Sequence, residues 1–158
     1  MQLAFDVSAP AYLRMGKSDR GDVHQLAITF KARQLLPLRT KKIALIATGS
    51  MVFAAQALVQ QGLDAEAWSA PSIKQMDSAT LAGIRRRVDC IITLEEHSVL
   101  NGLGSAVPML VAEARPLPVY RIGINDKFSS LRGTYDYLLE EHNLTVHAIH
   151  QKTSIFWI

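Results

Sequence analysis

The feature that most constrains the fold is a repeated order in which a short apolar run is followed by a turn and a helix-forming segment. Four such pairs follow one another, with the apolar runs at 43–47, 65–69, 88–94 and 119–123. Parallel strands that helices cover on both faces read as continuous apolar runs, and short βα units imply right-handed crossovers. The order therefore predicts a three-layer α/β/α fold around a mostly parallel sheet.

The limits of the remaining elements follow from capping residues and breakers. Segment 26–36 alternates less clearly and is expected to supply an edge strand, which could run antiparallel and would bring the sheet to about five strands. Helices are expected over 50–62, 77–87 (from Asp77, Ser78 or Thr80), 106–114, 129–142 (from Ser129 or Ser130) and 146–152. The expected core residues of the sheet are Ile43, Ile46, Val88, Ile91, Ile92 and Val119.

Length and composition fit one domain with a single core. The chain has 158 residues, of which 49% are hydrophobic and 20% charged, as in ordinary globular proteins. It has no run of about 18 apolar residues to span a bilayer, and residues 1–10 lack the pattern of a signal peptide. The lone Cys90 cannot form an internal disulfide, which fits a cytoplasmic protein and a role in core packing.

The charge balance argues against a nucleic-acid partner. The 17 basic and 14 acidic residues leave a net charge of only +3. Basic residues gather at 31–42 and at 85–87, the second group at a helix end where cations complement the dipole. Because no aromatic stacking platform accompanies either group, we interpret both as solvated surface rather than as phosphate-backbone contacts.

The residues most able to carry chemistry gather in the turn after the apolar run 88–94. They are Glu95, Glu96, His97, Gly102, Gly104 and Ser105. The acids and the histidine follow the carboxyl end of a strand, where α/β sheets usually bind ligands. The glycines permit a tight backbone path, and Ser105 is expected to cap the next helix. Two interpretations stay open: an ordinary strand-to-helix turn, or a turn that binds a ligand or a protein partner.

Three other patterns are candidates for sites. Gly49 and Ser50 open a helix at the end of another strand, where free amides can receive an anion. Glu95 and His97 suit an acid–base pair, and the alternative is a structural hydrogen bond. The histidines lack the i, i+4 spacing with a carboxylate that a helical metal site needs, so no metal site is predicted. No catalytic residue is assigned, because no nucleophile or nucleotide-binding glycine motif accompanies these groups.

Residues 95–107, EEHSVLNGLGSAV, resemble the VEEH-x-x-x-GGLGSAV stretch in the C-terminal domain of transketolase-type enzymes. Four further segments agree in order and spacing, so that the resemblance covers nearly all of residues 24–158. They are ALIATGS at 44–50, APSIKQMD at 70–77, YRIGINDKF at 120–128 and YDYLLEEHNLT at 135–145. Asn101 stands where the family pattern has its first glycine, and asparagine also tolerates the left-handed conformation.

The resemblance implies a division of the chain. Residues 1–23 look like the last strand of a preceding pyrimidine-binding domain plus a linker, and residues 24–158 look like the transketolase C-terminal domain. Arg14 matches the family's arginine that contacts the sugar phosphate, a role that suits a forked guanidinium. The alternative is an exposed arginine at a strand end, paired with Asp19.

For the complete enzyme, the resemblance implies transfer of a two-carbon ketol unit between sugar phosphates, with thiamine diphosphate and magnesium. The family binds these through a GDG motif and a glutamate on other domains, and this chain has no GDG triplet. We therefore expect a dimer-supporting domain that binds no cofactor and is inactive alone. The implied partners are the remaining transketolase domains, or an N-terminal subunit, and a second copy. The alternatives are the beta chain of a 2-oxoacid dehydrogenase and a free-standing regulatory module that binds a ligand.

Overall fold

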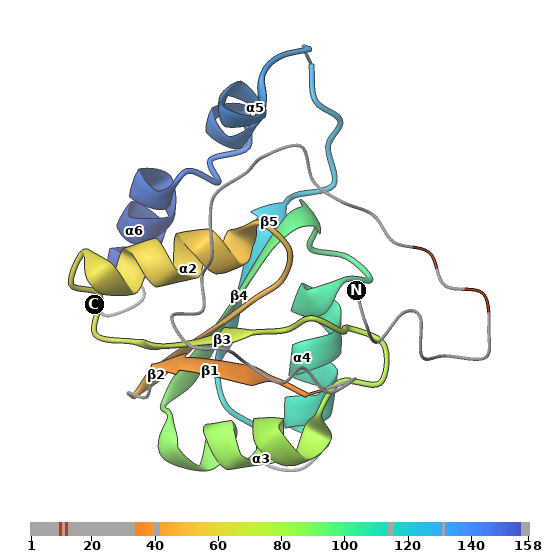
Figure 1. Ribbon diagram of the computed structural model, residues 1–158, viewed down its shortest axis with the longest axis vertical. Helices are drawn as coiled ribbons and strands as arrows, with labels where there is room; N and C mark the ends of the chain where they lie inside the picture. Colours follow the sequence, from red (N-terminus) through yellow and green to blue (C-terminus); the bar gives the residue numbers. More distant parts are fainter. Residues whose placement is uncertain are drawn as a thin grey trace.

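The structure is a computed structural model of the chain. It describes Pro10, Tyr12 and residues 34–39, 42–113, 116–130 and 132–155. One five-stranded sheet forms its centre, in the order β1-β3-β2-β4-β5 (Figure 1). The strands are β1 (Leu36–Arg39), β2 (Ile43–Ala47), β3 (Glu66–Ser69), β4 (Cys90–Ser98) and β5 (Val119–Ile124).

Four of these strands run parallel, and the edge strand does not. β2 lies between β3 and β4, and β5 pairs with the far side of β4, all in parallel. β1 pairs antiparallel with β3. The predicted mostly parallel sheet with an antiparallel edge is therefore confirmed.

The edge strand lies later in the chain than expected. β1 begins at Leu36, whereas the prediction placed the strand at 26–36. Residues 34 and 35 precede the strand, and residues 26–33 lie outside the described part of the chain. Pro37 falls within β1, and an edge position tolerates it because, within the described part of the chain, one side of this strand has no neighbouring strand to donate to.

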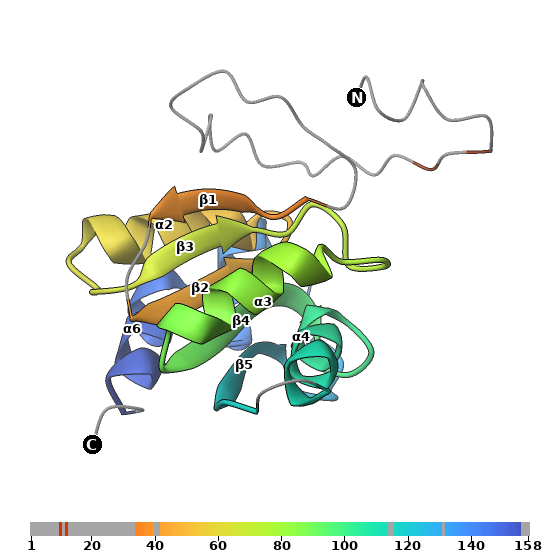
Figure 2. The same ribbon diagram turned by 90° about the horizontal axis from the view of Figure 1, so that it is seen from below.

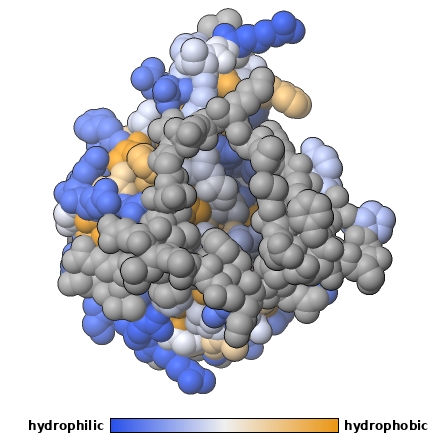
Figure 3. Space-filling view, in the orientation of Figure 1, coloured by the Kyte–Doolittle hydropathy of each residue, from blue (hydrophilic) through white to orange (hydrophobic). Residues whose placement is uncertain are grey.

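Helices cover both faces of the sheet. Figures 1 and 2 show α3 and α4 on one face and α2 and α6 on the other. The expected three layers are therefore present. Hydrophilic groups dominate the periphery of the described surface, with smaller hydrophobic patches between them (Figure 3). The helices are α2 (Met51–Gln60), α3 (Ser78–Arg87), α4 (Leu103–Ala112), α5 (Tyr135–Glu141) and α6 (Val146–Ile155).

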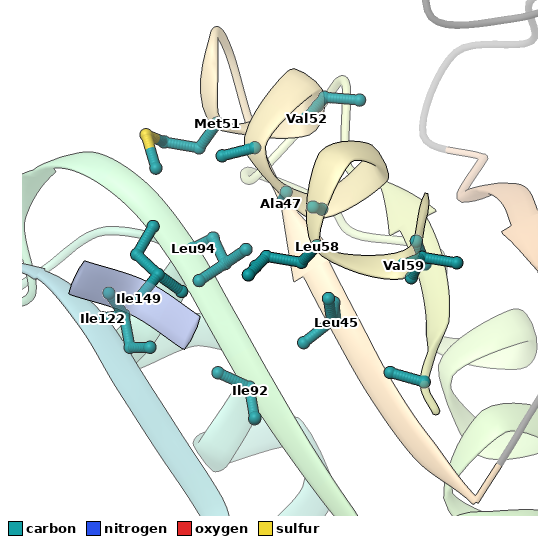
Figure 4. Close-up of a cluster of buried hydrophobic side chains, with 14 of the residues drawn as sticks. Leu45, Ala47, Met51, Val52, Leu58, Val59, Ile92, Leu94, Ile122 and Ile149 are labelled. Atoms are coloured by element: carbon teal, nitrogen blue, oxygen red, sulfur yellow. The ribbon is translucent and has the colours of Figure 1, made fainter. Parts of the chain in front are cut away.

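The sheet separates two hydrophobic clusters. Ile43 and Ile92 belong to a cluster with Leu45, with Leu58 of α2 and with Ile149 of α6. Figure 4 shows this cluster, with Leu45, Leu58, Ile92 and Ile149 labelled. On the opposite face, Ile46, Val88 and Ile91 pack with side chains of α3 and α4. Successive strand residues point to opposite faces, which is why Ile91 and Ile92 belong to different clusters. The predicted core residues are buried, apart from Val119, which is only partly buried at the edge of the second cluster.

The sequence placed the start of α3 at Asp77, Ser78 or Thr80, and the structure has Asp77 as the cap and Ser78 as the first helical residue. Asp77 accepts hydrogen bonds from the Thr80 amide at 2.9 Å and the Thr80 hydroxyl at 2.6 Å, which fixes the start of α3. Partial burial acts to raise the pKa of Asp77, but these hydrogen bonds and one from the Leu35 amide outweigh it and leave the pKa lowered.

Two other helix starts were predicted wrongly. α5 begins at Tyr135, with Thr134 as its cap, and not at Ser129 or Ser130. α4 begins at Leu103, ahead of the expected start at 106. In both cases the serines that were expected to cap form hydrogen bonds elsewhere. The last helix also runs on to Ile155, beyond the predicted end at 152.

Candidate functional site

The turn after β4 is organised around a buried carboxylate. Glu95 is only 1% exposed. Its Oε1 accepts a hydrogen bond from the Gly104 amide at 2.7 Å, and its Oε2 accepts one from the Leu103 amide at 2.9 Å. These are among the first amides of α4, which have no partner within the helix and lie at the positive end of its dipole. Glu95 therefore caps α4 with both carboxylate oxygens.

Ser105 does not cap α4 as the sequence predicted. Its hydroxyl accepts a hydrogen bond from the Asn101 amide at 2.9 Å and donates to the Val99 carbonyl at 3.2 Å. It closes the loop between β4 and α4 instead. Asn101 has a positive φ of 62°, so it takes the left-handed conformation that the sequence allowed for at this position.

The glycines of the turn make room for Glu95. A Cβ atom on Gly104 would lie 2.8 Å from Glu95 Oε1, and one on Gly102 would collide with Glu95 Oε2. Gly123 serves the same purpose from β5, because its Cβ would lie 2.8 Å from the His97 carbonyl oxygen and 3.0 Å from Glu95 Cγ. The sequence reasoning missed Gly123, although a glycine inside a strand is a signal for close backbone approach.

The three polar residues that follow Leu94 form a bulge in β4. Leu94 pairs with Ile122 and Ser98 with Ile124, so Glu95, Glu96 and His97 lie opposite Gly123 alone. Bulges of this kind commonly redirect side chains near functional sites. The strand thus continues to Ser98, past its predicted end at Leu94.

Glu96 joins two segments that the sequence analysis treated separately. Its Oε2 accepts a hydrogen bond from Ser50 Oγ, the residue before α2. The Tyr135 hydroxyl lies 2.8 Å from Glu96 Oε2 and 2.5 Å from Ser50 Oγ. Gly49 turns the chain here with a positive φ of 59°. The expected anion position at the start of α2 therefore has the protein's own carboxylate beside it.

Tyr135 is the second residue that sequence reasoning missed. It is the first residue of α5, and it lies 85 positions from Ser50 and 39 from Glu96. No local pattern predicts a contact over such separations. The nearest signal was its place in the segment YDYLLEEHNLT, which the resemblance picked out without assigning a role.

The histidines do not join this group. His97 is exposed, and within the described part of the chain its ring makes no hydrogen bond to Glu95 or Glu96. His142 is buried, with Nε2 2.7 Å from Ser129 Oγ. Among the described residues, no three histidine, cysteine or acidic side chains are grouped as a metal site would need.

The outer side of the turn opens onto a cavity of about 570 Å³ between α4 and residues 73–78. Gly102 and Ser105 line it from the turn, and Ile73, Met76 and Met109 supply apolar wall. The turn itself is thus bonded internally on one side and accessible on the other. The bonded side fits the structural interpretation of the turn, and the side that lines the cavity fits the binding interpretation.

Some sequence predictions fall outside the described residues. Arg14 is one of them, as is the rest of residues 1–23 apart from Pro10 and Tyr12. The described helices include none that is both long and apolar enough to cross a membrane.

Comparison with known proteins agrees with this architecture. Residues 33–149 match the family model of the transketolase C-terminal domain. The chain is 34% identical over 119 residues to the 6-deoxy-6-sulfo-D-fructose transketolase subunit SqwH of Clostridium sp. (strain MSTE9), covering 70% of this chain and 37% of that protein. It is 30% identical over 152 residues to a subunit of the apulose-4-phosphate transketolase of Actinobacillus succinogenes, covering 92% of this chain and 49% of that protein.

A solved structure is similar over almost the whole chain. It is described as a split gene transketolase, inactive beta4 tetramer, and it matches with a TM-score of 0.82 and 33% identity over 96% of this chain and 52% of that one. The chain thus spans about half or less of the length of these relatives. With the family model matched over most of its length and the fold shared, the chain belongs to the transketolase C-terminal domain family.

Proposed function

We propose that this domain serves assembly and domain placement in a transketolase-like enzyme, and that it performs no chemistry itself. The observation that carries the proposal is that both acids of the turn are engaged within the domain. Glu95 holds the start of α4, and Glu96 holds Ser50 and Tyr135. A carboxylate committed to helix amides is not positioned to exchange protons with a substrate.

The complete enzyme would transfer a two-carbon ketol unit between sugar phosphates, with thiamine diphosphate and magnesium bound by other domains. The absence of a GDG triplet from the chain supports placing the cofactor elsewhere. The names of the relatives, both transketolase subunits, support this reaction class over that of a 2-oxoacid dehydrogenase. Those names specify different sugars. The lone Cys90 supports a cytoplasmic location.

The proposed partners are the remaining transketolase domains, or a separate N-terminal subunit, and a second copy of this chain. The match to 37% and 49% of the length of two transketolase subunits supports the first. The description of the similar solved structure as a tetramer of beta chains supports the second.

The proposal is tested with the 158-residue chain and a purified polypeptide that carries a GDG motif and the other transketolase domains. Calorimetric titration of the chain alone with thiamine diphosphate and magnesium should give no heat of binding, and ketol transfer should appear only when both polypeptides are mixed. His97→Ala should leave the turnover number of the mixture nearly unchanged. Micromolar cofactor binding to this chain alone would contradict the proposal, as would a large loss of turnover in His97→Ala with the fold intact.

We further propose that Arg14 contacts the substrate phosphate in the complete enzyme. Arg14→Ala should weaken transition-state binding of phosphorylated sugars by about 1.5–3 kcal/mol, because hydrogen bonds to charged groups are of that size. Arg14→Lys is the matched control, since it keeps the charge and loses the planar fork. Equal effects on the kcat/KM values of phosphorylated and unphosphorylated sugars would instead indicate a structural arginine.

A further inference from the structure

The cavity beside the turn after β4 continues between α3 and α4, which lie side by side on one face of the sheet (Figures 1 and 2). A second cavity of about 270 Å³ adjoins it, because Ser78, Leu110 and Glu113 line both. We call the two cavities together the α3–α4 groove. The larger one, of about 570 Å³, already has the volume of a typical small-molecule site.

The larger cavity offers mainly apolar surface. α4 supplies Ala106, Met109 and Leu110, and the segment before α3 supplies Ile73 and Met76. Met109 is 64% exposed, so its side chain is free to close over a bound molecule. Methionine side chains are flexible and adapt to irregular shapes. The apolar part of a ligand can therefore be buried here.

The smaller cavity contains a guanidinium without a partner. Arg85 lines it and is half-buried. Its Nη1 is buried and has no hydrogen-bond partner, and within the described part of the chain Arg85 forms no ion pair. By contrast, Arg87 at the end of the same helix pairs with Glu66 at 3.1 Å. A guanidinium keeps its charge at all ordinary pH values, so an unpaired buried nitrogen costs free energy until an acceptor reaches it.

The other charges of the groove also favour an anion. Lys74 lines the larger cavity, and among the described residues its ammonium has no hydrogen-bond or ion-pair partner. Glu113 is the one acid among the described lining residues, and it is exposed. Arg85 lies seven residues after Ser78 on α3, which is about 10 Å along the helix axis. One small molecule can therefore reach both Arg85 and the apolar wall.

Two residues of the larger cavity have an unusual backbone conformation. φ is 59° at Gln75 and 62° at Asn101, and both residues line the cavity. Asparagine tolerates this left-handed conformation, whereas glutamine rarely adopts it. Strained positions of this kind concentrate at ligand sites. Gln75 belongs to the segment APSIKQMD, to which the resemblance gave no role.

We propose that the α3–α4 groove binds a small organic anion, with its apolar body against Met76 and Met109 and its anionic group at Arg85. Burial of the apolar body and charge-assisted hydrogen bonds from the guanidinium supply the affinity. The inference goes beyond the proposed assembly function and does not depend on it, because the groove uses neither Glu95 nor Glu96.

Fluorescence titration of the 158-residue chain with anilinonaphthalenesulfonate tests this inference. This probe carries one sulfonate on an aromatic body. Phenylnaphthylamine is the matched probe, because it has the same rings and no charge. The folded chain should bind the anionic probe saturably at one site, and the neutral probe about ten-fold more weakly or worse, since it forms no charge-assisted bond.

Variants locate the site. Arg85→Gln should weaken binding of the anionic probe about ten-fold or more and leave the neutral probe unaffected. Arg86→Gln is the matched control, because it removes the same charge from the next residue of α3, which lines neither cavity. Glu113→Gln should tighten binding of the anionic probe roughly three-fold by removing a repulsive charge. Met109→Ser should weaken both probes. Near-ultraviolet circular dichroism checks that each variant keeps its native packing.

Three results would overturn the inference. The first is no saturable binding of the anionic probe to the folded chain, or equal affinity for the two probes. The second is an equal effect of Arg85→Gln and Arg86→Gln on that binding. The third is a loss of ketol transfer by Arg85→Gln in the mixture of polypeptides with probe binding intact, which would assign the groove to the partner polypeptide. The proposed function is tested separately, by whether the wild-type mixture performs ketol transfer without any probe.

Discussion

Replacing Glu95 by glutamine should destabilise the domain far more than a single isosteric change usually does. The side chain is almost fully buried, and each carboxylate oxygen accepts one amide of α4. Glutamine keeps one accepting oxygen, but its NH₂ group faces the other amide, donor to donor. One charge-assisted bond is lost and one buried N–H is left without a partner.

The expected cost follows from these contacts. A hydrogen bond to a charged group contributes about 1.5–3 kcal/mol, and the favourable interaction of the charge with the helix dipole adds up to about 1 kcal/mol. We therefore expect Glu95→Gln to lower the free energy of unfolding by about 2–4 kcal/mol. With a urea slope of about 2 kcal/mol/M, the midpoint should fall by about 1–2 M. Circular dichroism during urea titration measures this midpoint.

The neighbouring acid provides the control. Glu96 is only partly buried, and Glu96→Gln retains an oxygen that can accept from Ser50 and Tyr135. Its cost should stay below about 1 kcal/mol. The capping argument is wrong if the free energy of unfolding of Glu95→Gln lies within about 0.5 kcal/mol of the wild-type value. It is also wrong if Glu95→Gln and Glu96→Gln lower that free energy by the same amount.

Three further predictions concern single positions. Gly104→Ala should cost about 1–3 kcal/mol by crowding Glu95, whereas Gly83→Ala should stabilise α3 by about 0.5–1 kcal/mol because its Cβ would meet only Arg87 Nη1, at 3.7 Å; equal urea midpoints for the two variants would contradict this. Burial, with Asp89 adding to it, raises the pKa of Cys90 to about 11, so the folded chain should resist iodoacetamide at about pH 8 and react once unfolded; rapid alkylation of the native chain would refute it. The hydrogen bonds from the Ser130 amide and hydroxyl lower the pKa of Glu141. They therefore stabilise the fold at pH values above the ordinary carboxyl pKa, and this contribution is lost as pH falls through the lowered pKa. The NMR shift of the Ser130 amide should follow that transition, and a shift that does not change with pH would contradict the prediction.

The sequence was sufficient wherever structure depends on neighbours along the chain. The central strands were found because each is a short apolar run, and α3 was placed because Asp77 caps it from three residues away. α4 was misplaced because its cap, Glu95, lies eight and nine residues from the amides that it binds. The serines before α5 looked like caps, but they bond to residues 11 and 13 positions later. Local patterns carry no information about such partners.

The paired acids at the end of β4 reach opposite faces of the sheet. Successive residues point to opposite faces of a sheet, and helices cover both faces here. Glu95 reaches α4 on one side, while Glu96 reaches the start of α2 and the first residue of α5 on the other. Two consecutive carboxylates at the carboxyl end of β4 therefore bind the helical layers on both faces of the sheet. This accounts for acids in a turn that resembles an active site, without assigning either of them to catalysis.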